Sequence, residues 1–170
     1  WGFYGRVTDD GRFLIINVSQ GTDPKNRVFY LDLESPDAQV VELLDDFDAS
    51  YDFIDNDGSV FYFRTDLSAP RGRIVAIDTT RPERAHWREL IPESPDSLEN
   101  VHRVAETFIV EYLHHAASQV KFFDRNGKLT QELTLPGLGS VAGFGGRRSD
   151  SETFFSYTSF TTPTTIYRLD

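Results

Sequence analysis

The chain has 170 residues and a formal net charge of −10, because 27 Asp and Glu residues outnumber 17 Lys and Arg residues. This acidity argues against a nucleic-acid or anionic-membrane partner. The chain has no cysteine, which excludes disulfides, a thiol nucleophile and thiolate metal sites. Its apolar runs, such as residues 13–16, are far shorter than a membrane span, so we expect a soluble chain.

The first 48 residues contain the pattern of four strands, at residues 1–7, 12–18, 27–32 and 39–45. The first two strands are joined by Asp9-Asp10-Gly11, and Asp-Gly pairs are typical of tight hairpin turns. A loop with glycine and proline, residues 19–26, leads to the third strand. That strand, RVFYLD, is rich in β-branched and aromatic residues and ends in an aspartate that favours a turn.

The same pattern returns three more times along the chain. Residues 49–97 form a second unit, with strands expected at 51–54, 59–64, 73–78 and 87–91. Residues 98–137 form a third unit, with strands at 101–105, 107–112, 119–124 and 128–135. Residues 138–170 form a fourth, with strands at 140–144, 153–157 and 165–170 and no outer strand.

The third strand of each unit carries the clearest repeat. Its four copies are RVFYLD, RIVAID, QVKFFD and TIYRLD, and their last residues are 46 positions apart: Asp32, Asp78, Asp124 and Asp170. Four-stranded units of this length are the signature of β-propeller blades. We therefore predict an all-β chain that forms a β-propeller of four consecutive four-stranded antiparallel blades, the last one incomplete.

Two features indicate that the chain is an excerpt or a processed product. It contains no methionine, even at position 1, and its last blade lacks the outer strand. Four blades in the curvature of a larger ring would leave a sheet face uncovered at each end of the arc. We therefore expect the isolated fragment to self-associate.

The antiparallel connectivity predicts which loops share one edge of the propeller. Connections between second and third strands should lie on the same side as connections between blades. The first group is residues 19–26, 65–72, 113–118 and 158–163, and the second is residues 47–49, 92–100 and 136–139. This rim is where we expect any loop-mediated binding.

Two motifs suggest catalytic or nucleotide-binding chemistry, and neither has the required context. No G-x-S-x-G occurs, so the chain lacks the elbow that holds a hydrolase nucleophile. Residues 137–142 match a loose G-x-G-x-x-A, but they lead into a strand instead of the helix that a pyrophosphate needs. We interpret them as a turn between blades and expect no cofactor.

Three further groups of polar residues have simple explanations. Residues 55–58, DNDG, lack the remaining ligands of a calcium loop and are interpreted as a hairpin turn. His114 and His115 are adjacent, so on a strand they would point to opposite faces and would not share a metal ion. They lie on the predicted rim and are candidates for contact with a substrate or another domain. Arg147 and Arg148 are expected in an exposed turn.

Several longer segments are similar to one known family. They include QGTDPKNR at 20–27, YTSFTTP at 157–163, and FRTD at 63–66, with IPE at 91–93, YLH at 112–114 and GSV at 139–141. In order and spacing they resemble the second half of the propeller of prolyl oligopeptidases. The similarity runs through essentially the whole chain.

The resemblance implies a seven-bladed propeller that caps an α/β-hydrolase domain, which cuts short peptides after proline. The family's catalytic serine, aspartate and histidine all belong to the hydrolase domain, which would follow Asp170. In the family, the loop equivalent to residues 19–22 lines the substrate cavity. It often has an arginine where this chain has Ser19 and a cysteine where this chain has Thr22.

We therefore expect the non-catalytic propeller portion of a prolyl-oligopeptidase-like serine peptidase, without catalytic residues of its own. Its expected partners are the hydrolase domain of the same parent chain and short peptides at the rim. The candidate rim residues are Ser19, Gln20, Thr22, His114 and His115. The resemblance is compatible with a cytoplasmic or periplasmic parent. The alternatives are a freestanding propeller-like protein-interaction module and a small propeller enzyme of the lactonase or glycosidase kind.

Overall fold

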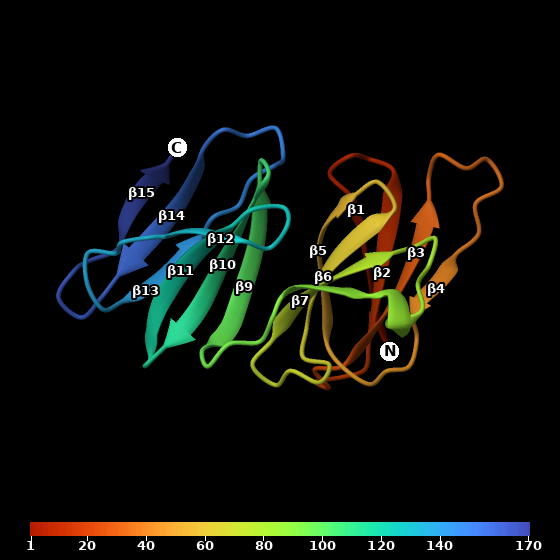
Figure 1. Cartoon of the computed structure of the whole chain (residues 1–170), viewed down its shortest axis with the longest axis horizontal. Coiled ribbons are helices and arrows are strands. Elements are labelled where there is room, and N and C mark those ends of the chain that lie inside the picture. Colours follow the sequence, from red (N-terminus) through yellow and green to blue (C-terminus); the bar gives the residue numbers. More distant parts are fainter. The chain divides into compact units, whose positions relative to one another are not determined.

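A computed structural model describes all 170 residues, and its 15 β-strands form four antiparallel sheets (Figure 1). The chain divides into two compact units, Trp1–Pro92 and Glu93–Asp170, and each contains two sheets. The helix η1 (Arg84–His86) has three residues, and no helix is long and apolar enough to cross a membrane. The prediction of an all-β chain is confirmed.

Each sheet is a meander in which the strands pair in sequence order. The first unit contains β1 (Gly2–Val7), β2 (Phe13–Ser19), β3 (Asn26–Asp32) and β4 (Val41–Leu44), followed by β5 (Tyr51–Asp57), β6 (Val60–Thr65), β7 (Arg73–Asp78) and β8 (Arg88–Ile91). The second contains β9 (Ser97–Val104), β10 (Thr107–His114), β11 (Ala117–Phe123) and β12 (Leu129–Glu132), followed by β13 (Ser140–Gly143), β14 (Thr153–Thr158) and β15 (Thr165–Leu169). The last sheet has three strands, as predicted.

Two predicted loops are wrong in the second unit. Strand β9 begins at Ser97, within residues expected to be a connection, because Leu98 is buried and pairs with Tyr112. The expected loop at 113–118 is a two-residue turn, since His114 pairs with Ala117. His115 and Ala116 both have positive φ, at 47° and 62°, which is the pattern of a type I′ hairpin turn. The turn contains no glycine, and glycine is the residue that usually marks such a turn.

The aspartate that ends the repeated strand has a defined structural role. Its side chain accepts a hydrogen bond from the backbone N–H two residues later, in the pairs Asp32 with Glu34 (3.1 Å), Asp78 with Thr80 (2.9 Å) and Asp124 with Asn126 (2.9 Å). This is an Asx turn, which ends a strand by replacing a sheet hydrogen bond with a local one. The backbone N–H and hydroxyl of Thr80 hold the pKa of Asp78 below its ordinary value.

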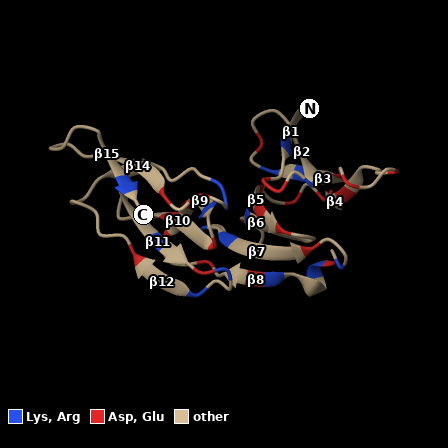
Figure 2. Cartoon of the chain, turned by 90° about the horizontal axis from the view of Figure 1, so that it is seen from above, with Lys and Arg blue, Asp and Glu red and all other residues tan.

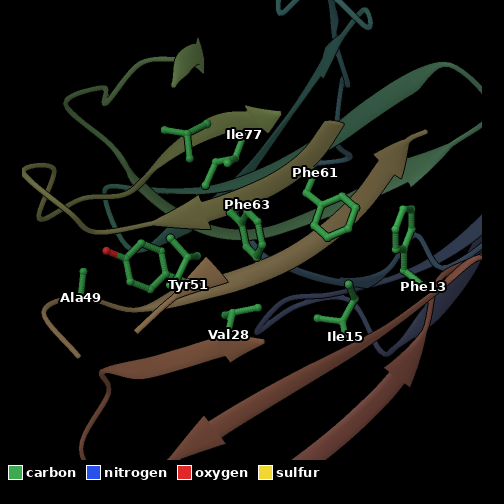
Figure 3. Packing of buried hydrophobic residues seen from close by; sticks show 10 residues of the cluster. Phe13, Ile15, Val28, Ala49, Tyr51, Phe61, Phe63 and Ile77 are labelled. Atoms are coloured by element: carbon green, nitrogen blue, oxygen red, sulfur yellow. The ribbon is translucent and has the colours of Figure 1, made fainter. Parts of the chain in front are cut away.

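The first unit is held together by a hydrophobic core between its two sheets. Phe13, Ile15 and Val28 of the first sheet pack against the second sheet's Phe61 and Phe63 (Figure 3). The rings of Phe13 and Phe61 meet edge to face, with centroids 4.9 Å apart. Both Phe61 and Phe63 are fully buried. Neither sheet has enough apolar partners of its own to bury this face, so the two sheets stabilise each other.

The second unit has an equivalent core. Ile109, Val120 and Phe122 pack against Phe155 and Tyr157, which lie on β14. In addition, Phe144 stacks on Phe155 with a centroid distance of 4.8 Å, and Phe155 stacks on Tyr167 at 5.3 Å. Each unit is therefore a pair of sheets around its own core.

Polar side chains join the two sheets of the first unit at both ends. At one end, the Asn56 side-chain amide donates a 2.8 Å hydrogen bond to Asp10, and these residues are separated by the repeat period of 46. At the other end, the Asn26 amide donates to the carbonyl of Tyr51 and accepts from its N–H, at 2.8 and 2.6 Å. The repeat therefore places equivalent turns of successive sheets side by side.

An ion-pair cluster holds the long β7–β8 connection against the segment between the first two sheets. The Arg84 guanidinium contacts Asp46 at 2.9 Å and also bonds Asp48. The Tyr51 hydroxyl donates to Asp48 at 2.7 Å. Burial alone would raise the pKa of Asp48, but the bonds from Tyr51 and Arg84 outweigh it, and the pKa is lowered. Burial and the Asp48 carboxylate raise the pKa of Tyr51.

Replacing Phe61 with alanine should lower the free energy of unfolding by about 3–5 kcal/mol, because it leaves a cavity between the sheets of the first unit. Urea denaturation followed by circular dichroism measures this loss. Leu33→Ala is the control, since Leu33 lies in the same unit and is 46% exposed, and its truncation should cost under about 1 kcal/mol. Equal losses in the two variants would contradict this description of the core.

Replacing Arg84 with glutamine should lower the free energy of unfolding by about 0.5–1 kcal/mol at neutral pH, as for other partly exposed ion pairs. Because the folded-state pKa of Asp48 is lowered, the contribution is present above the ordinary aspartate pKa and is lost as the pH falls through the folded-state value. Denaturation at several pH values should therefore show the difference shrinking in acid. The exposed Arg88→Gln variant should show no such pH-dependent difference.

Candidate binding rim

In the first unit, loops of the predicted rim lie at the same end of the sheets. The N–H of Asn26, at the end of the β2–β3 loop, donates to the carbonyl of Ala49 in the connection to β5 at 3.1 Å. The N–H of Ser50 donates to the side chain of Asp66, which lies in the β6–β7 loop, at 2.8 Å. These bonds join three loops into one surface.

Ser19, Gln20 and Thr22 lie at this end of the first unit. Ser19 is the last residue of β2 and pairs with Asn26, whereas Gln20 and Thr22 are exposed in the following turn. The turn is closed by a 3.1 Å hydrogen bond from the N–H of Asp23 to the carbonyl of Gln20. Contact of these residues with a substrate stays a prediction.

The second unit also brings rim loops together. The N–H of Ser118 donates to the carbonyl of Gly139 at 2.8 Å, and the Ser118 hydroxyl accepts from the N–H of Val141 at 3.1 Å. These bonds fix the β10–β11 turn against the start of β13. On the other side of the turn, His114 Nδ1 lies 2.7 Å from the carboxylate of Asp96.

His114 and His115 are in contact, because His115 lies in the turn and not on the strand. Their ring centroids are 4.2 Å apart and the rings are nearly edge to face. Burial, together with the charge of Asp96, raises the pKa of the neighbouring Tyr112 to about 12. The chain has no group of three or more His, Asp and Glu side chains arranged to hold a metal ion. The two histidines therefore form a rim feature with one carboxylate partner.

Two surface depressions flank the β10–β11 turn. One has a volume of about 450 Å³ and lies between β11 and the segment after β12, with His114, Gln119, Glu132 and Leu135 in its lining. The other has a volume of about 520 Å³ and is lined by His115, Ser140, Thr158 and Phe160. Ala117 and Leu138 line both. Most of this lining belongs to the predicted rim loops at 113–118, 136–139 and 158–163, but Leu138 and Phe160 were not among the candidate site residues. The available signal was an apolar residue isolated among turn residues, as in Gly137-Leu138-Gly139 and Ser159-Phe160-Thr161.

The glycine motif at 137–142 has a packing role. A Cβ atom on Gly139 would lie 2.4 Å from the carbonyl oxygen of Thr158 and 2.7 Å from the ring of Tyr157. Glycine is therefore required because the backbone passes directly against β14. The prediction of a turn between sheets is confirmed.

The other polar motifs lie at or beside turns. The expected hairpin turn at residues 55–58 is wrong in its position, because Asp55, Asn56 and Asp57 belong to β5 and pair with β6, so the turn itself is at Gly58 and Ser59. Gly58 has a φ of 55° and closes the β5–β6 hairpin, and Asp57 accepts a 2.7 Å hydrogen bond from the Tyr62 hydroxyl. Arg147 begins a turn in which its N–H donates to the Asp150 carboxylate at 2.7 Å. Acidic and basic residues are interspersed along both units (Figure 2).

Comparison with known proteins identifies the family. Residues 1–170 match the model described as the prolyl oligopeptidase N-terminal β-propeller domain. A prolyl endopeptidase of Elizabethkingia meningoseptica is 33% identical over 162 residues, which are 95% of this chain and 23% of that protein. A prolyl endopeptidase of Elizabethkingia miricola is 31% identical over 164 residues, which are 96% of this chain and 23% of that protein.

Solved structures give the same result. A structure from a study of two prolyl endopeptidases has a TM-score of 0.91 and 36% identity, covering 99% of this chain and 25% of that one. Prolyl oligopeptidase B from Galerina marginata has a TM-score of 0.91 and 25% identity, covering 100% of this chain and 24% of that one. The chain thus spans about a quarter of the length of these relatives. With its meander sheets and its match over every residue, it belongs to the prolyl oligopeptidase family, within the N-terminal β-propeller domain.

Proposed function

We propose that this chain is the non-catalytic propeller portion of a serine peptidase that cleaves short peptides after proline. In this proposal it covers an α/β-hydrolase domain of the same parent chain, as part of a seven-bladed propeller, and limits access to the active site. The observation that carries the proposal is the match of residues 1–170 to the family's propeller domain. The prolyl endopeptidases that the chain resembles, each about four times its length, support it.

The packing of the sheets is suited to such a filter. A filter must keep its shape while a peptide presses against its loops, and the two cores hold the strands of each unit firmly in place. The rim loops are tied to neighbouring loops by backbone hydrogen bonds, such as those at Asn26 and Ser118. In the proposal, Ser19, Gln20, Thr22, His114 and His115 line the substrate cavity.

The peptidase assignment is tested by comparing the isolated chain with the full-length protein that carries it. The chain alone should not release nitroaniline from a blocked Gly-Pro nitroanilide above a buffer control, whereas the full-length protein should. The full-length protein should also cut a short proline-containing peptide much faster than an unfolded protein with the same cleavage site. Hydrolysis by the chain alone, or none by the full-length protein, would contradict the proposal.

The isolated chain should self-associate if it is part of a larger domain. The second unit carries an apolar face on which Phe154 is 52% and Ile166 is 67% exposed, and β1 carries Phe3 at 74%. Such faces are normally covered. Sedimentation velocity should show species larger than a monomer, and the double substitution Phe154→Asp with Ile166→Asp should shift them toward the monomer. A monodisperse monomer before substitution would sink this expectation.

A further inference from the structure

The two depressions beside the β10–β11 turn adjoin each other, because Ala117 and Leu138 line both. We call this surface the hairpin groove. It lies entirely within the second unit, between the β10–β11 turn, the segment after β12 and the β14–β15 loop. Its two halves, of about 450 and 520 Å³, are each in the size range of ligand pockets.

Apolar side chains stand exposed along this groove. Leu138 is 88% exposed, and Phe160 is fully exposed at the tip of the β14–β15 loop. Large apolar side chains that are exposed to solvent beside a surface depression are typical of binding surfaces. Neither side chain packs into the core of the second unit, so neither is needed for folding.

The backbone that carries these side chains is fixed. The bonds of Ser118 to Gly139 and Val141 hold one wall. In the other wall, the Ser159 N–H donates to the carbonyl of Thr162 at 3.0 Å, and the Ser159 hydroxyl accepts from the Thr162 N–H at 3.1 Å. A groove formed before the ligand arrives loses little entropy on binding.

The charges of the groove favour a cationic ligand. Its lining contains Glu132 and no lysine or arginine, and Asp96 lies behind His114. Glu132 is oriented by a 2.8 Å hydrogen bond from the Gln119 side-chain amide, whose oxygen has no partner of its own. Glu132 therefore offers a positioned carboxylate. Lys121 is the cross-strand partner of Glu132, but its ammonium group lies over the Tyr112 ring, 5.3 Å from the centroid, and is not part of the lining.

We propose that the hairpin groove binds an extended peptide, with an apolar side chain between Leu138 and Phe160 and a positively charged group beside Glu132. In an extended chain, alternate side chains project on the same side about 7 Å from each other, so one peptide could place a side chain in each of two adjoining depressions. The inference rests on the proposed function, and it gives the peptide a second holding point outside the catalytic domain.

The test measures binding of a fluorescein-labelled peptide with a lysine and a phenylalanine two positions apart, to the 170-residue chain and to the full-length protein, by fluorescence anisotropy. The variant with Leu138→Asp and Phe160→Asp should raise the Kd at least about tenfold. Leu33→Asp is the matched control, because Leu33 is also an exposed leucine, at 46%, but lies in the first unit, and it should leave the Kd within about twofold. Glu132→Gln should weaken binding about threefold for the lysine peptide and leave an acetyl-lysine peptide unchanged.

Each outcome decides the question. Unchanged binding in the Leu138 and Phe160 variant, or no binding to the unsubstituted chain, overturns the inference. Binding to the 170-residue chain but not to the full-length protein also overturns it, because the groove is then covered by another domain. Hydrolysis of the Gly-Pro nitroanilide by the full-length protein is measured in parallel. If that hydrolysis persists while binding fails, only the groove is disproved; if it is absent, the peptidase assignment fails on its own.

Discussion

The constraint on which the rest of the structure depends is that no sheet in this chain can bury its own faces. In the first unit, Phe13 of one sheet and Phe61 of the next fill the same core, and neither side is complete without the other. When successive sheets of one chain have the same structure and pack on each other, residues at equivalent positions come into contact. This favours a sequence repeat of constant length. The hydrogen bond between Asp10 and Asn56, 46 residues apart, is a direct consequence.

The same constraint explains where the polar residues are placed. Within the strands, apolar residues occupy both faces, as in β7, where four successive residues are buried. Many polar groups lie at strand ends, where Asx turns reverse the chain and Asn26 links successive sheets, whereas buried polar groups within strands have partners, as Glu111 has in His102 at 3.2 Å. The ends of the sheets are left to carry loops whose sequence is free to vary, and these loops are where binding residues are expected.

The fold could be predicted from the sequence because the strand pattern and the turn-forming aspartates are both local features. The strand pattern and the turn-forming Asp32, Asp78 and Asp124 can be recognised without knowing what they contact. The tight turn at His115 and Ala116 was missed because neither residue favours positive φ, so only the pairing of β10 with β11 reveals it. The hairpin groove was missed for a related reason. The strand connectivity places its loops on one rim, but residues of three separate segments, 114–119, 132–140 and 158–160, line the depressions, and no local pattern shows which of their side chains do so.

The strained turn and the groove belong together. Positive φ costs a residue other than glycine about 1–2 kcal/mol, and asparagine followed by glycine would form this turn without that cost. His115 and Ala116 both have positive φ at adjacent positions, so the turn carries this cost twice. Both residues line the groove. Glycine at either position would remove a side chain from that wall, and His115 would lose its contact with His114, 4.2 Å away. Phe47, Ser68, Ala105 and Phe144 also have positive φ and lie outside the groove, so positive φ is not by itself a mark of this surface. What distinguishes the turn at His115 and Ala116 is that two such residues are adjacent and that both side chains line the wall of the proposed groove.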